Sequence, residues 1–261
     1  NGEIADVYED SWVFRASDTS FQMHAGWDVQ SLGLGFYELT APGGSVQDVL
    51  GWSHAQQSVE YVEPNAVLRM YATPNDPSFA QLWGLENTGQ SGGVIDADID
   101  ATDAWDVTTG SRDVVIAVID GGVDYTHEDL AANMWQNPGE IPGDGIDNDN
   151  NGYIDDVYGY DFGDDDNDPM DDDAGWLGHG THVAGTVGAV GDNNLGVAGV
   201  NWNTSIMALK IAGSVSGAVG SVNYVTMMKQ RGVNIAASNN SWGGSDYQAL
   251  RDAVDAHCDA G

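Results

Sequence analysis

The chain has 261 residues, of which 41% are hydrophobic, and its 41 acidic side chains against seven lysines and arginines give a formal net charge of −34. This length and hydrophobic content can bury a full α/β core, which excludes a disordered protein. The negative charge repels nucleic acid and anionic membranes, so we expect no nucleic-acid partner. No stretch of 18 apolar residues occurs, so we expect no membrane span, and the single cysteine, Cys258, cannot form an internal disulfide.

The first 72 residues are expected to form a separate, small α+β module. Residues 35–40 have the pattern of a strand, residues 45–57 that of an amphipathic helix, and residues 59–68 that of a second strand interrupted at Pro64. We therefore place a domain boundary after residue 72, with a second domain over residues 73–261.

A buried strand is predicted at residues 114–119, after a helix over residues 101–109 for which Gly110 would be the cap. The unbroken run Val-Val-Ile-Ala-Val-Ile is typical of a strand buried on both faces of a parallel sheet. Asp120 follows directly and should lie at the carboxyl edge of the sheet, where open α/β folds build their sites. A buried carboxylate there needs a hydrogen-bond donor such as an imidazole. The alternative is that Asp120-Gly121 is an ordinary turn.

Residues 144–173 contain thirteen aspartates, and such a density of like charge favours cations as partners. Within this segment Asp-Asn-Asp-Asn-Asn-Gly at 147–152 matches the opening of a calcium loop. Tyr158 stands where a closing glutamate is expected, so Asp155 or Asp156 would close the cage. The predicted calcium ligands are Asp147, Asp149, Asn151, Asp155 and Asp156. The alternative is a solvated acidic loop, which we favour for residues 171–173.

His179 lies in a glycine-rich segment, residues 177–191, that nevertheless has helical spacing of its valines. Each interior glycine costs a helix about 1 kcal/mol relative to alanine, so we expect close burial against a strand to compensate. An Asp120–His179 pair would fix the imidazole tautomer and stabilise the cation formed during acyl transfer. The alternative is an ordinary core or surface histidine.

Strands and helices alternate through the rest of the chain. We predict strands over residues 206–211 and 233–238, and helices over residues 220–231 and 245–260. The last helix would begin with a capping box of Ser245 and Gln248 and would bury Cys258 beside Leu250 and Val254. Repeating strand–helix units predict an α/β fold with a doubly wound parallel sheet.

Three motifs resemble those of the subtilisin-like serine proteases: residues 118–124 the aspartate motif, residues 178–185 the histidine motif, and residues 239–244 the substrate-strand segment. Their order along the chain is also the family's. The resemblance extends from about residue 73 to the end. It implies a subtilisin-like fold and a secreted serine endopeptidase in which Asp120 and His179 belong to an Asp-His-Ser triad. It further implies that Ser241, Trp242 and Gly243 pair with protein or peptide substrates, with Trp242 lining a side-chain pocket. The alternative for Trp242 is ordinary packing of an aromatic side chain in the core.

The resemblance also implies a calcium site and an inhibitory segment. The calcium ligands carried over from the family are Asp76, Asp129, Val190, Asn193, Leu195 and Val197, with turn residues as the alternative reading. The first 72 residues resemble the second half of the family's propeptide, an intramolecular inhibitor whose tail would be residues 67–73. The alternative is an accessory domain with no inhibitory role.

The family's Gly-Thr-Ser nucleophile motif does not occur among the 261 residues, and the strand before its oxyanion asparagine would begin near Gly261. We therefore interpret the chain as an inactive fragment of a zymogen of a serine endopeptidase. The alternative is a catalytically incompetent, calcium-stabilised binding protein with the same fold. Nucleotide binding is disfavoured because no phosphate-loop glycine pattern is present.

Overall fold

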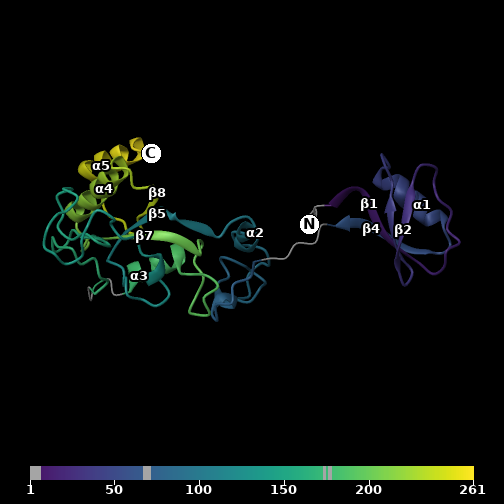
Figure 1. The fold of residues 1–261 in the computed structure, drawn as a ribbon, viewed down its shortest axis with the longest axis horizontal. Helices are drawn as coiled ribbons and strands as arrows, with labels where there is room; N and C mark the ends of the chain where they lie inside the picture. Colours follow the sequence, from purple (N-terminus) through teal and green to yellow (C-terminus); the bar gives the residue numbers. More distant parts are fainter. Residues whose placement is uncertain (1–6, 67–71, 173–174, 176–177) are drawn as a thin grey trace. The chain divides into compact units, whose positions relative to one another are not determined.

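The computed structural model describes residues 7–66, 72–172, 175 and 178–261. The chain divides into two compact units, residues 1–70 and residues 71–261 (Figure 1).

The first unit is an antiparallel sheet with one helix packed on it. Its elements are β1 (Val7–Ala16), β2 (Asp28–Gly33), β3 (Phe36–Thr40), α1 (Val46–Ala55) and β4 (Val59–Ala66). The strand order is β2-β3-β1-β4, and neighbouring strands are antiparallel. Phe14 of β1, Leu39 of β3 and Val49 of α1 are fully buried and form the centre of its core.

The sequence predicts β3, α1 and β4 but not β1 and β2. In β1, Asp10 has a φ of 59° and the pairing register shifts between Val7 and Trp12, so the alternation of apolar and polar residues is broken. Strand β2 is almost entirely exposed and carries no apolar pattern. Pro64 lies inside β4 instead of interrupting it, because β4 is an edge strand, where a missing N–H is tolerated.

The second unit is built on a parallel sheet in the order β6-β7-β5-β8. The strands are β5 (Gly110–Asp120), β6 (Gly159–Asp161), β7 (Asn203–Lys210) and β8 (Ile235–Asn239). The helices are α2 (Ala101–Trp105), α3 (His179–Gly188), α4 (Val215–Gln230) and α5 (Gln248–Asp259), with 3-10 turns at Phe79–Gln81 and Ala131–Asn133. The predicted α/β fold with helices on both faces of a parallel sheet is confirmed.

Strand β5 is buried on both faces, as its run of β-branched residues predicts. Val118 points to the side of α3 and packs with Ala184, whereas Ile119 points to the other side and packs with Val222 and Val225 of α4. Helix α3 therefore lies on one side of the sheet and helices α4 and α5 on the other (Figure 1). No helix in the described part of the chain is long and apolar enough to cross a membrane.

Three predictions about the last two helices are wrong. Helix α4 begins at Val215 and not at residue 220, because the Ser214 hydroxyl caps it by accepting from the Gly217 amide at 3.0 Å. Helix α5 begins at Gln248 after Tyr247, with no side-chain cap, so the expected Ser245–Gln248 capping box is absent. Cys258 is exposed, because α5 buries the face of Ala253.

Candidate functional site

Asp120 and His179 meet where β5 ends and α3 begins. Asp120 is the last residue of β5 and His179 the first of α3, and the His179 Nδ1 lies 2.7 Å from Asp120 Oδ1. The aspartate is fully buried, whereas the imidazole is 46% exposed. The same Oδ1 accepts from the Gly121 amide at 2.7 Å, and the Asp120 carbonyl accepts from the Ile211 amide at 3.0 Å. A buried carboxylate is thus paired with an imidazole that solvent can reach.

The glycines of α3 explain how the helix comes so close to the strand. A Cβ on Gly180 would lie 2.0 Å from the Gly122 carbonyl oxygen and 3.0 Å from the Asp120 Cβ. At the other end of the helix, a Cβ on Gly188 would lie 2.5 Å from the Thr204 side chain. Close burial against the sheet therefore offsets the helix cost of these glycines.

The end of the acidic segment contacts this site, which corrects the expectation of a solvated position at Asp171 but not at Asp172, whose side chain is 68% exposed. Asp171 is 9% exposed and accepts three hydrogen bonds from Gly178 and Thr181. Asp172 accepts from Lys210 Nζ at 2.7 Å. The donors of Asp171 lie seven and ten positions further along the chain, and the donor of Asp172 lies on β7; local composition does not reveal either pairing. Residue 173 lies outside the described residues.

The predicted substrate segment follows β8. Ser241 and Gly243 are exposed, and the Ser241 hydroxyl donates to Asn239 Oδ1 at 2.8 Å. Trp242 is half-buried against the core, and its indole N–H donates to the Ile119 carbonyl at 2.8 Å. The tryptophan therefore anchors the segment to the strand that carries Asp120.

The structure brings together the side chains of the first predicted metal set. Asp76 and Asp129 are 4% and 2% exposed and both face the loop over residues 190–197. Asp76 accepts from the amides of Asp192 and Asn193, and Asp129 accepts from the Asn193 side chain at 2.7 Å and from the Val197 amide. The Val190 amide donates to the Asp129 carbonyl, and the Leu195 amide donates to Asn193 Oδ1.

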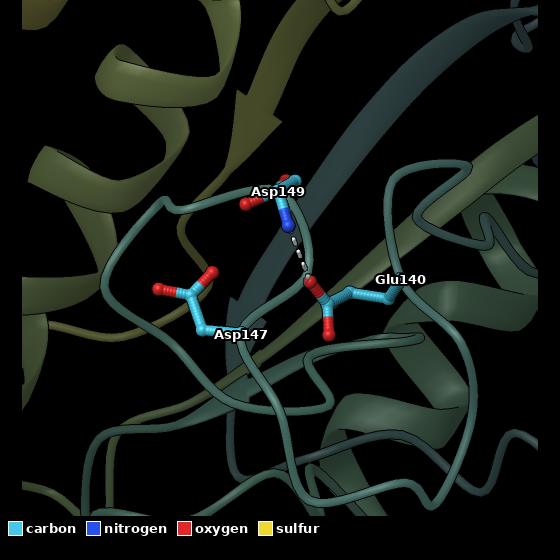
Figure 2. Close-up of side chains that lie close together, drawn as sticks. All are labelled: Glu140, Asp147 and Asp149. Atoms are coloured by element: carbon cyan, nitrogen blue, oxygen red, sulfur yellow. Dashed lines mark hydrogen bonds between the residues drawn. The ribbon is translucent and has the colours of Figure 1, made fainter.

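In the second predicted metal set, Asp147 and Asp149 cluster with Glu140, which the sequence pattern does not single out. One carboxylate oxygen from each lies within 4.8 Å of the others. Figure 2 shows the Asp149 amide donating to the Glu140 carboxylate, at 3.1 Å. Asp149 Oδ1 is buried and lacks a hydrogen-bond partner among the described residues, with Arg231 Nη2 at 3.4 Å as its ion-pair contact. Three carboxylate oxygens this close together are hard donors of the kind that calcium prefers, so the cluster fits calcium chemistry.

The other members of this set have different contacts. The Asp155 carboxylate accepts from the amides of Gly143, Asp144 and Gly145, so it holds the turn at residues 143–145. Asp156 is fully buried and accepts a hydrogen bond from Tyr224. Its burial raises the pKa of the carboxyl, although the hydrogen bonds from Tyr224, Asn151 and Asn137 act to lower it.

The amide of Asn151 joins Asp156 to the predicted calcium loop. Asn151 Nδ2 donates to Asp156 Oδ2 at 2.8 Å and to Asp149 Oδ2 at 3.3 Å. Asn137 Nδ2 bridges the same two aspartates at 3.1 and 2.9 Å. Asp156 thus ties the loop to helix α4 through Tyr224.

Comparison with known proteins identifies the family. Residues 111–261, more than half of the chain, match the model of the subtilase family, Peptidase S8. The chain belongs to the subtilase family of serine proteases.

Three curated relatives illustrate the similarity. The chain is 38% identical over 169 residues to a thermophilic serine proteinase of Bacillus sp. (strain AK1), covering 64% of this chain and 33% of that protein. It is 35% identical over 162 residues to the halolysin-like extracellular serine protease Nep of Natrialba magadii, covering 62% and 24%. It is 44% identical over 106 residues to subtilisin-like protease 1 of Plasmodium berghei, covering 40% and 17%. The chain therefore spans a third or less of the length of these relatives.

Solved structures agree with the family. A protease structure from Pseudoalteromonas arctica aligns with a TM-score of 0.51 and 27% identity, covering 73% of this chain and 57% of that one. The complex of an Aeromonas sobria serine protease with a chaperone aligns with a TM-score of 0.53 and 22% identity, covering 72% and 30%. The second likeness concerns the fold alone.

Proposed function

We propose that this chain is part of a serine endopeptidase that cleaves proteins or peptides, with Asp120 and His179 as two members of an Asp-His-Ser triad. The observation that supports this most directly is the 2.7 Å contact between His179 Nδ1 and the buried Asp120 carboxylate at the carboxyl edge of a parallel sheet. Membership of the subtilase family supports the reaction class.

The geometry suits general base catalysis. When Nδ1–H donates to Asp120, the basic nitrogen of the neutral ring is Nε2, the one that takes a proton from a serine hydroxyl. The serine then attacks the peptide carbonyl, and the buried Asp120 stabilises the imidazolium. The triad serine would belong to the full-length protein, because no Gly-Thr-Ser motif occurs in the 261 residues.

The substrate would lie along the segment at 241–243. An extended peptide pairs there with backbone groups, which gives affinity with little demand on side-chain identity. The Trp242 indole donates to the carbonyl of Ile119, the residue before Asp120, and would hold this segment beside the end of β5. In this proposal the indole N–H of Trp242 anchors the segment to β5 and is not available to a substrate side chain in the pocket.

The first unit would act as an intramolecular inhibitor, as the resemblance of residues 1–72 to a propeptide implies. One relative is named an extracellular protease, which supports secretion of this protein as well. The alternative remains a catalytically incompetent binding protein with the same fold.

An assay of a full-length clone on a denatured protein substrate separates these functions. We expect the wild type to digest the substrate and His179→Ala to lower the rate by at least about 10⁴-fold, because the general base is lost. A wild type that binds the substrate without cleaving it would favour the binding protein.

Calcium is the metal that both carboxylate clusters would hold, in a structural role. Asp76, Asp129 and the 190–197 loop form one cluster, and Glu140, Asp147 and Asp149 form the other. Calcium prefers six to eight oxygen ligands, which carboxylates, side-chain amides and carbonyls supply.

Calcium is expected to raise the melting temperature of the 261-residue chain. A ligand at about 100 times its Kd adds about 2.7 kcal/mol to the free energy of unfolding, or about 5–10 °C in Tm for a unit of this size. Asp147→Asn should reduce this shift, because it removes a charged ligand. Asp144→Asn removes the same charge from an exposed position of the same segment and should keep the shift. Equal shifts in the two variants, measured by calorimetry after exhaustive chelation and calcium addition, would contradict the assignment.

A further inference from the structure

Helix α3 receives its amino-terminal cap from a residue outside the helix. Its N-cap is Gly178, which has no side chain to accept from the exposed amides of the first turn. Asp171 takes this role from seven positions upstream: Oδ1 accepts from the Gly178 amide at 3.1 Å and Oδ2 from the Thr181 amide at 3.0 Å. Since Asp171 is 9% exposed, water competes little for these hydrogen bonds.

The Thr181 hydroxyl joins this cap to the turn that follows Asp120. It donates to Asp171 Oδ2 at 2.7 Å and accepts from the Asp124 amide at 2.9 Å. Thr181 lies two residues after His179, and Asp124 lies four residues after Asp120. One hydroxyl therefore connects the segments that carry the two members of the catalytic pair.

The neighbouring residue, Asp172, ties the same segment to the sheet. Its carboxylate accepts from Lys210 Nζ at 2.7 Å, and Lys210 also pairs with Asp161 at 3.1 Å. Burial by itself would lower the pKa of Lys210, but the hydrogen bonds to Asp172 and Asp161 outweigh it and raise the pKa. The hydrogen bond from Lys210 also lowers the pKa of Asp172, so this pair stays charged near neutral pH. Lys210 is the register partner of Asp120 on the adjacent strand β7.

We propose that Asp171 is a positioning residue of the peptidase site. This role rests on the proposed function. The Asp171 carboxylate fixes the first turn of α3, and with it the His179 ring, against Asp120. Thr181 transmits the constraint, and the Asp172–Lys210 pair holds the segment on the sheet. A misplacement of about 1 Å in a catalytic group can cost about 100-fold in rate. Losing the carboxylate should therefore lower kcat and leave KM nearly unchanged, because none of its hydrogen bonds involves the substrate segment at 241–243.

The tautomer of the His179 ring shows whether the hydrogen bond to Asp120 is formed, and it can be measured without any peptide hydrolysis. In the 15N-labelled 261-residue chain at alkaline pH, ring-nitrogen chemical shifts should show the Nδ1–H form in the wild type, and Asp171→Ala should shift the population toward the Nε2–H form. Thr181→Val and Thr181→Ser are a matched pair: the valine loses the bridging hydroxyl and should shift the tautomer, whereas the serine keeps it. Ser214→Ala removes the cap of α4 and controls for a general loss of stability.

The outcomes separate this proposal from the function on which it rests. An unchanged tautomer in both Asp171→Ala and Thr181→Val, or an equal change in Ser214→Ala, overturns the positioning role. If Asp171→Ala fails to fold, the two Thr181 variants decide alone. A wild-type chain without the Nδ1–H form refutes the Asp120–His179 pair itself. A full-length protein that has this form yet cleaves no peptide refutes the peptidase function and leaves the positioning of His179 intact. In an active full-length clone, Asp171→Ala should lower kcat about 100-fold, and a change confined to KM would count against it.

Discussion

Replacing Asp120 with asparagine in a full-length clone is expected to lower kcat by about 10⁴-fold, the size of loss seen when the aspartate of a Ser-His-Asp triad becomes an amide. The substitution keeps the shape of the side chain but turns one oxygen into an N–H₂ group. An amide facing His179 Nδ1 at 2.7 Å favours the wrong tautomer and cannot stabilise an imidazolium in a fully buried position. Steady-state kinetics on a short peptide substrate measure the effect, and KM should change little.

Asp113 provides the matched control for this experiment. It lies on the same strand, β5, but at the opposite end of it, and it is exposed. Asp113→Asn makes the same chemical change and should leave kcat within about twofold of wild type, since surface substitutions away from special contacts have small effects. A loss below tenfold in Asp120→Asn, with both variants folded, would refute the catalytic role of Asp120.

The two segments that carry the proposed catalytic pair, Asp120 and His179, were predictable because each has a strong local pattern. Residues 114–119 form a nearly continuous β-branched run, which is typical of parallel strands buried on both faces. The carboxyl ends of such strands share one edge, so an aspartate placed there is expected near other functional groups. The valines and glycines around His179 together indicate a helix pressed against a strand, which the position of Gly180 bears out.

Residues whose partners lie outside their own local sequence pattern escaped prediction. Glu140 lies seven positions before the calcium-like loop and reaches it only through the fold. Asp171 and Asp172 sit in a run of like charge, which favours a solvated reading, yet their donors are on α3 and β7. Local composition records the charge of such residues but not the distant groups that satisfy it. The same reason explains Cys258, whose exposure depends on which face of α5 meets its neighbours.

Two glycines of α3 should respond in opposite directions to alanine. At Gly180 a new Cβ would lie 2.0 Å from the Gly122 carbonyl oxygen, a backbone atom that no rotamer change can move. Helix α3 must then shift away from β5, and we expect a loss of about 3 kcal/mol or more in the free energy of unfolding, the upper range for overpacking. In the 261-residue chain this corresponds to a Tm lower by about 6–12 °C.

At Gly185, on the same helix, a new Cβ would meet no atom within 4 Å. The substitution there removes only the flexibility of glycine, so it should raise stability by up to about 1 kcal/mol. Calorimetry of the two variants side by side isolates the contact with Gly122 from any general effect of alanine in α3. If Gly180→Ala were as stable as Gly185→Ala, the helix could not lie as close to the strand as the Asp120–His179 hydrogen bond requires. The close approach that lets the imidazole reach its carboxylate would then need another explanation.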